Sequence, residues 1–299
     1  MKVAITGASG LVGTALSRRL EEDGHQITRV VRSREAAGEP DAVYWKPSTG
    51  EIDAAGIAGH DAVVNLAGEN IFGIWTTAKK RRIRESRVRG TALMAETLAG
   101  LDPDVRPGVL INSSGVHYYG EGGPDRPMTE DAPPASGFMA ELVQDWEAAT
   151  RPAADAGVRV VMLRSGVVLD PEALILKGMS VSTRFGLGAK LGDGGQPFPW
   201  ITRDEVADVV AFALARDDLE GPVNTVAPDR VTNEEFADTV ARVLDRPRAL
   251  AVPRFALQML GDLSDVILTG AWVVPEKLEA AGYRWRDPEL EPALRRMLT

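Results

Sequence analysis

The sequence has no cysteine among its 299 residues. That absence excludes disulfides, thiolate metal sites and cysteine nucleophiles together, and we expect no bound metal. No apolar run approaches the roughly 18 residues needed to span a bilayer, so no membrane partner is expected. The chain opens on the strand-like stretch 2–6, which predicts that no signal peptide is present. A cytoplasmic location fits these absences.

Positive charge is also in short supply. The chain has 34 Lys and Arg against 43 Asp and Glu, a net charge of -9. Proteins that bind duplex nucleic acid usually present a basic face, so no nucleic-acid partner is expected. The one basic run, residues 79–89, is interpreted as a solvated helix face. The alternative is that one or two of its cations help to hold an anionic cofactor or substrate.

Short β-branched runs alternate with longer amphipathic stretches, in a chain of ordinary globular composition. We expect strands at residues 3–5, 26–31, 42–45, 62–66, 109–113, 158–163 and 223–226, and helices at 11–22, 76–101, 138–156 and 203–215. Such alternation implies right-handed crossovers and a parallel sheet covered on both faces. The predicted fold class is α/β, a Rossmann-type doubly wound parallel sheet of about seven strands.

A glycine motif joins the first expected strand to the first expected helix. Residues 7–13 read G-x-x-G-x-x-G, the context that a dinucleotide-binding turn requires. Glycine permits the tight turn and lets the backbone approach a pyrophosphate at a helix N-terminus. The predicted cofactor contacts here are Gly7, Ser9, Gly10, Leu11, Val12 and Gly13.

The end of the second strand indicates which dinucleotide is bound. A protein that prefers NAD usually places an acidic residue there, on the ribose hydroxyls. Here the strand runs into Arg32, 19 positions after Gly13. A guanidinium binds a 2′-phosphate through paired hydrogen bonds, whereas an acid would repel it. We therefore predict NADP(H) as the cofactor, with Arg32 as a further contact.

Several further stretches carry a family resemblance. They are residues 64–71, 86–87, 118–120, 145–147, 164–169, 185–188, 199–201, 274–278 and 282–283. Together with the glycine motif they resemble the extended short-chain dehydrogenase/reductase superfamily over nearly the whole chain. Within it, the sequence is similar to the poorly characterised "epimerase family" proteins of the NAD-dependent epimerase/dehydratase branch, whose members carry a C-terminal domain of unknown function.

The resemblance implies further cofactor contacts. Leu66, Ala67 and Gly68 would pass beside the adenine and ribose side of the cofactor, and Glu69 would follow in a loop that faces the same cleft. Arg164 ends a strand at the carboxyl edge of the sheet, where ligands bind in such folds. It would reach a ribose or a phosphate, or else form a salt bridge at the strand end.

The resemblance also exposes a gap in the chemistry. The superfamily uses a Tyr hydroxyl as acid and base, with a Lys four residues later that lowers the Tyr pKa and holds the ribose. None of the four Tyr in this chain is followed by Lys at that spacing. On the expected helix, Phe138 and Leu142 stand in the two positions. Neither side chain transfers a proton.

The loop after the fifth strand offers the candidate catalytic residues, Ser114, His117 and Tyr118. The superfamily's Ser aligns without a gap on Gly115, and a single-residue insertion would restore Ser114. His117 is the one histidine placed to donate a proton near pH 7, with a surface histidine as the alternative. One of Tyr118 and Tyr119 is expected to pack under the loop and the other to present its hydroxyl to the cleft.

These patterns lead to two hypotheses about function. The first is an NADP(H)-binding oxidoreductase or epimerase-like enzyme that acts on a small carbonyl or hydroxyl substrate. The second is a catalytically inactive NADP(H)-binding sensor or interaction protein, which the loss of the Tyr and Lys favours. A homodimer through helices 76–101 and 138–156 is an open alternative to a monomer.

The second half of the chain is expected to hold the substrate. Residues 170–200 are rich in Gly and Pro, which indicates a loop over a site, with Phe198 or Trp200 as an apolar wall. Thr232 and Glu235 have the spacing of a capping box. We predict an NADP-binding Rossmann domain over 1–169, with 201–228 returning to it. Residues 170–200 and 229–299 would form a smaller, mainly helical substrate-binding domain.

Overall fold

The computed structural model describes residues 1–299 apart from 124, 248–249, 260 and 262. Its centre is an eight-stranded sheet in the order β11-β7-β6-β5-β1-β2-β3-β4. The strands are β1 (Lys2–Thr6), β2 (Gln26–Val31), β3 (Ala42–Lys46), β4 (Glu51–Ile52), β5 (Ala62–Asn65), β6 (Val109–Gly115), β7 (Arg159–Ser165) and β11 (Gly221–Thr225). All pairings are parallel except that of β4 with β3. The predicted Rossmann-type α/β fold is confirmed, and β4 is the strand that the sequence did not reveal.

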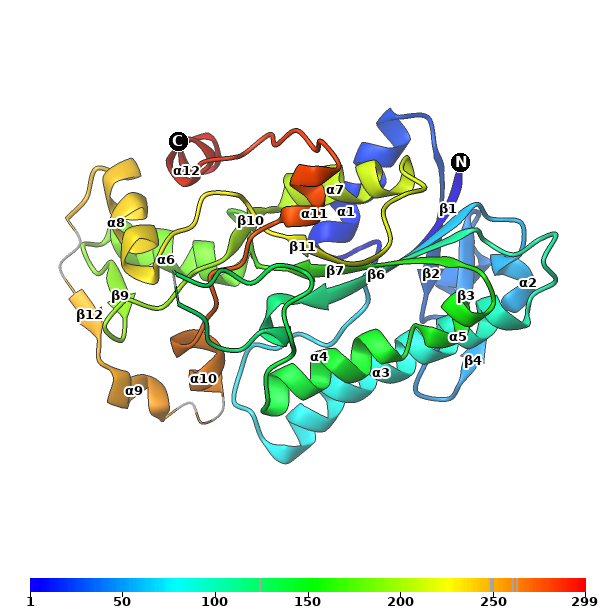
Figure 1. Ribbon diagram of the computed structural model, residues 1–299, viewed down its shortest axis with the longest axis horizontal. Helices are drawn as coiled ribbons and strands as arrows, with labels where there is room; N and C mark the ends of the chain where they lie inside the picture. Colours follow the sequence, from blue (N-terminus) through cyan, green and yellow to red (C-terminus); the bar gives the residue numbers. More distant parts are fainter. Residues whose placement is uncertain (124, 248–249, 260, 262) are drawn as a thin grey trace.

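Helices cover both faces of this sheet (Figure 1). On one face lie α1 (Leu11–Glu22) and α7 (Arg203–Leu214), packed with the strands around Ile5, Ile111 and Val209. On the other lie α3 (Thr77–Gly100), α4 (Phe138–Ala148) and α5 (Arg151–Asp155). The short helix α2 (Ala54–Ile57) and the 3-10 turns η1 (Ala36–Gly38) and η2 (Val116–Tyr118) complete this part. The helix expected at 138–156 is divided because Pro152, which lacks a backbone N–H, stands in the first turn of α5.

The second lobe contains more regular structure than expected. Its elements are β8 (Val167–Leu169), α6 (Leu174–Arg184), β9 (Ala189–Leu191), β10 (Trp200–Thr202), α8 (Asn233–Val243), β12 (Leu250–Val252), α9 (Arg254–Gln258), α10 (Leu263–Leu268) and α12 (Leu290–Leu298). The short helix α11 (Glu276–Ala280) instead packs on the central sheet beside β11. The prediction of a loop throughout 170–200 was wrong, because α6 forms there and buries Leu176 against Phe236 of α8. The capping box of Thr232 and Glu235 is present at the start of α8.

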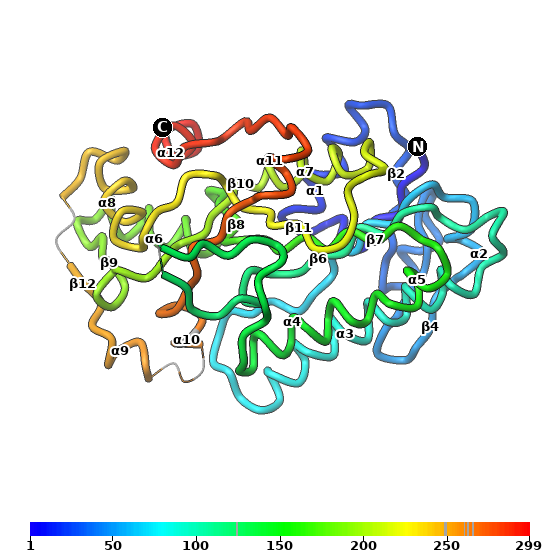
Figure 2. The backbone as a smooth tube through the Cα atoms, viewed as in Figure 1, coloured from blue at the N-terminus to red at the C-terminus, as the bar shows by residue number. Residues whose placement is uncertain are grey.

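Segments far apart in the sequence join the two lobes. The chain around residue 128 runs beside the chain around residue 273 (Figure 2). Met128 pairs with Val273, and its amide donates to the carbonyl of Trp272 at 2.6 Å. Leu278 is fully buried in the core cluster that contains β1, α1 and α7. The core of the sheet therefore takes in part of the segment 229–299 that was assigned to the second domain. Among the described residues, no helix is both long and apolar enough to cross a bilayer.

Candidate functional site: a dinucleotide groove at the carboxyl edge of the sheet

The glycine loop between β1 and α1 is built on close backbone contact. Gly7 has a φ of 69°, in the left-handed region, and its carbonyl accepts a hydrogen bond from the Gly10 amide at 2.9 Å. A Cβ on Gly13 would lie 2.1 Å from the Gly7 carbonyl oxygen and 2.7 Å from Cα of Ala8. No side chain fits there. The loop thus holds the start of α1 tightly against the end of β1.

The start of α1 is free to receive an anion. Gly10 is its N-cap and provides no side-chain hydrogen bond to the first turn. The amides of Leu11, Val12 and Gly13 therefore have no capping partner, and a helix N-terminus favours negative charge. Ser9 is exposed beside them. This cradle of glycines and open amides fits a diphosphate.

The segment after β5 lies along the same loop. The Thr6 hydroxyl donates to Asn65 at 2.7 Å and accepts from the amides of Leu66 and Ala67 at 3.0 and 3.1 Å. A Cβ on Gly7 would lie 3.2 Å from the Ala67 amide nitrogen. These bonds fix the segment 66–69, hereafter the strap, against the glycine loop. The sequence-predicted contacts Leu66, Ala67 and Gly68 thus lie next to the cradle.

Arg32 lies at the neighbouring strand end. Strand pairing sets Thr6 opposite Val30, so Arg32 follows β2 directly beside the glycine loop. Its side chain is exposed, and no carboxylate within the described chain is paired with it. The nearby Arg34 instead forms an ion pair with Glu51 and stacks on Tyr44 at 4.2 Å. Of these two cations, Arg32 is the one available to a ligand.

Glu69 ends the strap as a paired carboxylate. It accepts a hydrogen bond from Lys79 at 2.8 Å and lies 3.5 Å from Arg82. The hydrogen bond from Lys79 lowers the pKa of Glu69 below its usual value. Part of the basic run at 79–89 therefore neutralises this carboxylate. The Glu69 side chain positions α3 against the strap.

Arg164 does not face the groove. Its guanidinium donates to both carboxylate oxygens of Glu147, each at 2.8 Å, and to the Tyr119 hydroxyl at 2.8 Å. A further bond at 3.2 Å goes to the carbonyl of Glu130, and Arg164 is only 3% exposed. The expected contact with a ribose or phosphate is therefore replaced by the alternative, a salt bridge at the strand end.

Ser114 belongs to the same buried network. It is 7% exposed, and its hydroxyl donates to Glu147 at 2.6 Å. The expectation of Ser114 as a catalytic residue is corrected, because its hydroxyl is bound inside the protein. A Cβ at Gly115, the ungapped position, would come within 4.0 Å of His117 Nδ1. Neither of the two aligned positions, Ser114 and Gly115, therefore offers a free hydroxyl.

The two adjacent tyrosines have different roles. Tyr119 is 3% exposed, and its hydroxyl donates to Asn224 at 2.7 Å. Burial raises the pKa of Tyr119 to about 12. Tyr118 packs the face of its ring on the Arg164 guanidinium at 3.5 Å. Its hydroxyl has no hydrogen-bond partner among the described residues and is accessible to solvent. Tyr119 is thus the tyrosine under the loop, and Tyr118 has the accessible hydroxyl.

His117 is unsuited to donate a proton at pH 7. Burial, with a smaller contribution from the charge of Arg87, lowers its pKa to about 4. The imidazole is therefore neutral near pH 7 and carries no extra proton to give. The expectation of a proton donor at His117 is corrected in this respect. A neutral ring remains able to accept a hydrogen bond.

This lowered pKa predicts an acid-sensitive stability. The pKa of His117 is lower in the folded protein than in the unfolded chain, so the unfolded chain takes up a proton first as the pH falls. The protein therefore loses stability between about pH 6.5 and about pH 4. We expect His117→Asn to remove about 1–3 kcal/mol of that loss. Urea unfolding of both proteins at pH 4.5 and pH 7 measures it. Equal losses in the two proteins would contradict the assignment.

An apolar cluster fills the positions of the missing catalytic pair. Leu142 is fully buried with Ile83 and Leu263, and Phe138 packs at their edge. The Phe138 ring meets Trp75 edge-on at a centroid distance of 5.5 Å. No proton-transferring group takes the place of the superfamily's Tyr and Lys on this face of α4.

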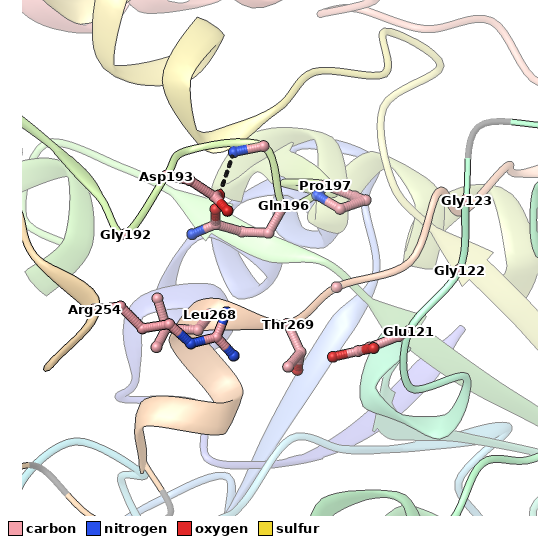
Figure 3. A pocket seen from close by; sticks show the side chains of 12 residues that line it. Glu121, Gly122, Gly123, Gly192, Asp193, Gln196, Pro197, Arg254, Leu268 and Thr269 are labelled. Atoms are coloured by element: carbon pink, nitrogen blue, oxygen red, sulfur yellow. Dashed lines mark hydrogen bonds between the residues drawn. The ribbon is translucent and has the colours of Figure 1, made fainter. Parts of the chain in front are cut away.

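A cavity of about 560 Å³ opens between the lobes, next to the loop that follows η2. Its lining includes Glu121, Asp193, Gln196, Arg254 and Thr269. The Arg254 and Glu121 side chains extend toward Thr269 from opposite sides, and the Asp193 carboxylate accepts from the Gly195 amide at 2.9 Å (Figure 3). The cavity is therefore polar and contains charges of both signs.

The expected apolar wall of this cavity is absent. Trp200 is fully buried and donates to the Asp229 carbonyl at 3.0 Å. Phe198 stacks on Phe236 at a centroid distance of 4.3 Å. Both rings belong to the core of the second lobe. The cavity is lined instead by the adjoining Gly192, Asp193, Gly195, Gln196 and Pro197. Sequence reasoning missed Arg254 and Glu121, which no motif marks.

The doubly wound sheet, the glycine loop and the second lobe define a dinucleotide-binding fold of the extended short-chain dehydrogenase/reductase class. A family model described as "NAD dependent epimerase/dehydratase family" matches residues 3–226, and a domain of unknown function matches residues 252–297. The chain belongs to the NAD dependent epimerase/dehydratase family.

Similar proteins extend over the whole chain. "Epimerase family protein Mb2239" of Mycobacterium bovis is 39% identical over 295 residues, covering 98% of this chain and 96% of that protein. "Epimerase family protein SDR39U1" of Homo sapiens is 34% identical over 304 residues and covers 100% of both. A crystal structure of the human protein (isoform 2) with NADPH has a TM-score of 0.88 at 33% identity and covers 99% of each chain.

Proposed function

We propose that this chain binds NADP(H) and acts as an oxidoreductase or epimerase-like enzyme on a small carbonyl or hydroxyl substrate. The observation that carries the proposal is the uncapped amino end of α1 above a loop whose Gly13 leaves no room for a Cβ. Such a cradle suits the diphosphate of a dinucleotide. The human relative whose structure contains NADPH supports the same cofactor.

The adenosine end supports NADP(H) over NAD(H). Arg32 is exposed beside the glycine loop and forms no ion pair with a described residue. A free guanidinium at this place matches a 2′-phosphate in charge and in hydrogen-bond geometry. An NAD-binding site would favour a carboxylate there.

The chain's own residues supply the rest of the chemistry. When bound, the cofactor supplies hydride transfer to or from a substrate carbon. Tyr118 has an accessible hydroxyl and packs on Arg164, and we assign it the role of giving a proton to the substrate oxygen. The cavity lined by Arg254 and Gln196 would bind the remainder of a polar substrate.

One observation favours the second candidate, a binding protein without turnover. The buried apolar cluster of Leu142 and Ile83 fills the place of the proton-transfer pair. A sensor needs the cofactor groove alone, whereas an enzyme also needs a substrate cavity such as the one beside Thr269. This cavity makes the enzyme the better supported proposal.

Purified protein tests the two candidates. We expect NADPH fluorescence to change on binding and NADPH to be oxidised in the presence of one class within a panel of aldehydes, ketones and 2-oxo acids. Tyr118→Phe should retain binding and lose turnover. Binding without turnover across the panel would favour the sensor. No binding of either nicotinamide dinucleotide would refute both.

Reversal of charge at Arg32 tests the 2′-phosphate contact. Arg32→Glu removes charge-assisted hydrogen bonds and adds repulsion, so we expect NADPH affinity to fall by about a hundredfold. NADH lacks this phosphate, and its affinity should change by about threefold or less. Calorimetric titration with both dinucleotides measures the difference, and Arg34→Glu is the matched control. Equal losses for both ligands would exclude the assignment.

A further inference from the structure

Arg87 of α3 is a largely buried cation with unusual surroundings. Its Nη1 atom donates to the carbonyls of Glu69 and Ile83 at 3.0 and 3.3 Å. A Cβ on Gly68 would lie 3.3 Å from its Cζ, so the guanidinium rests directly against the strap. On its other side is Trp146 of α4, with its ring centroid at 5.1 Å. The guanidinium is thus held between the strap and an aromatic ring.

The packing of α3 against α4 accounts for this position. Lys80 lies over the Phe138 ring at 5.3 Å, Ile83 packs with Leu142, and Arg87 lies over Trp146. Successive contacts are three or four residues apart on both helices, so one face of α3 packs along one face of α4. Arg87 therefore places its charge about one helical turn beyond Leu142, the vacant lysine position.

The remaining donors of Arg87 have no hydrogen-bond partner among the described residues. Within the described residues no carboxylate pairs with it, and no hydrogen bond involves its Nε or Nη2. Nε of Arg106 is a buried atom without a hydrogen-bond partner. Nε and Nη2 of Arg87 also lack a partner, but they are accessible to solvent. Burial lowers the pKa of Arg87 to about 10, and the group remains charged at pH 7. A buried charge with free donors is costly unless a ligand satisfies it.

The order of the strand ends along the groove indicates how such a ligand would lie. Arg32 follows β2, the glycine loop follows β1, the strap follows β5 and His117 follows β6. These four strands are consecutive neighbours in the sheet. An extended ligand with its phosphate at Arg32 and its diphosphate over the glycines therefore continues along the strap to Arg87.

We propose that Arg87 binds the nicotinamide-bearing half of NADP(H), where it donates from α3 to oxygen atoms of the ribose or its phosphate. It supplies from a neighbouring helix the positive charge that α4 lacks at Leu142. The inference rests on the proposed NADP(H) function and adds a residue outside the glycine loop and the strand ends. Arg87 is a binding and positioning residue in this role.

Two probes of different length test this assignment. NADPH spans the whole groove, whereas adenosine 2′,5′-bisphosphate carries the adenosine end and no nicotinamide half. We expect Arg87→Met to lower the affinity for NADPH by about tenfold or more, as measured by calorimetry. The affinity for the bisphosphate should stay within about twofold of the wild type. Arg87→Lys should restore part of the NADPH affinity, because it returns the charge.

A matched control comes from the same helix. Arg89 is exposed and paired with Glu85 at 3.3 Å, so Arg89→Met should leave both affinities unchanged. Arg32→Glu, in contrast, should lower the affinity for both probes. If Arg87→Met does not fold, Arg87→Gln gives the same comparison, because it retains a donor for the carbonyl of Glu69.

The outcomes separate this inference from the proposed function. Wild-type affinity for NADPH in Arg87→Met would overturn the assignment, and so would an equal loss for both probes, because that would place the effect in the fold. A wild-type protein that binds neither probe would refute the proposed function and the inference with it. A selective loss of NADPH supports both.

Discussion

Replacement of Arg164 by Met is expected to lower the free energy of unfolding by about 3–5 kcal/mol, because it leaves the buried Glu147 carboxylate without its cation. The two side chains are 4% and 10% exposed and share two hydrogen bonds of 2.8 Å. Burial alone lowers the pKa of Arg164, but the bonds and charge of Glu147 raise it above its usual range. Arg164 therefore keeps its positive charge at pH 7. Urea unfolding at pH 7 measures the loss.

The double replacement provides the control. Arg164→Met combined with Glu147→Leu removes both charges, so its loss should be smaller than the sum of the two single losses. Lys177 forms an exposed pair with Glu172, and Lys177→Met is expected to cost about 1 kcal/mol or less. A loss of about 1 kcal/mol or less for Arg164→Met would contradict the importance of the buried network.

The same network explains the orientation of the proposed acid. Arg164 bonds to Glu147 and Tyr119 in its plane and offers its flat face to the Tyr118 ring. A planar guanidinium is able to do both at once, whereas the ammonium group of Lys is not. Arg164 thus acts on the groove indirectly. Its loss should disturb Tyr118 as well as the fold.

Local patterns predicted the sheet well. The G-x-x-G-x-x-G motif and the β-branched runs gave β1, α1 and β2 with correct ends for α1 and β2, because the turn chemistry and the periodicity are local. The two-residue strand β4 is too short to show a period. The helix α6 was missed because Gly178 and its neighbouring Ser residues resemble a loop, while its stabilising contact with α8 lies far along the chain.

The site was less predictable, because burial and pairing are non-local. Arg164 was placed correctly at a strand end, whereas Ser114, expected in the loop after the fifth strand, lies within β6. Both side chains bind Glu147, which lies on α4. The low pKa of His117 depends on burial and on Arg87, 30 positions earlier. Strand position alone does not reveal which way a side chain turns. The basic run that contains Arg87 was interpreted as a solvated helix face, with a role in holding an anion as the alternative, and residues 86–87 entered only as part of the family resemblance.

Addition of one methyl group at Gly13 is expected to abolish cofactor binding. The new Cβ of Gly13→Ala would meet the Gly7 carbonyl oxygen at 2.1 Å and two backbone atoms of Ala8 within 2.9 Å. These are backbone atoms, so relief requires the loop to move away from α1. The amides that face the diphosphate then separate from Gly7, and we expect NADPH affinity to fall by about a hundredfold or more. Overpacking should also cost about 1–3 kcal/mol of stability.

Gly178 of α6 is the matched control, because it is also helical and a Cβ there would meet nothing within 4 Å. Gly178→Ala should leave NADPH affinity unchanged and raise stability by up to about 1 kcal/mol, since Ala favours a helix over Gly. Calorimetry and urea unfolding on the two variants measure both effects. If Gly13→Ala bound NADPH within about threefold of the wild type, the diphosphate would have to lie elsewhere, because a cradle that tolerates the displacement is not holding the ligand.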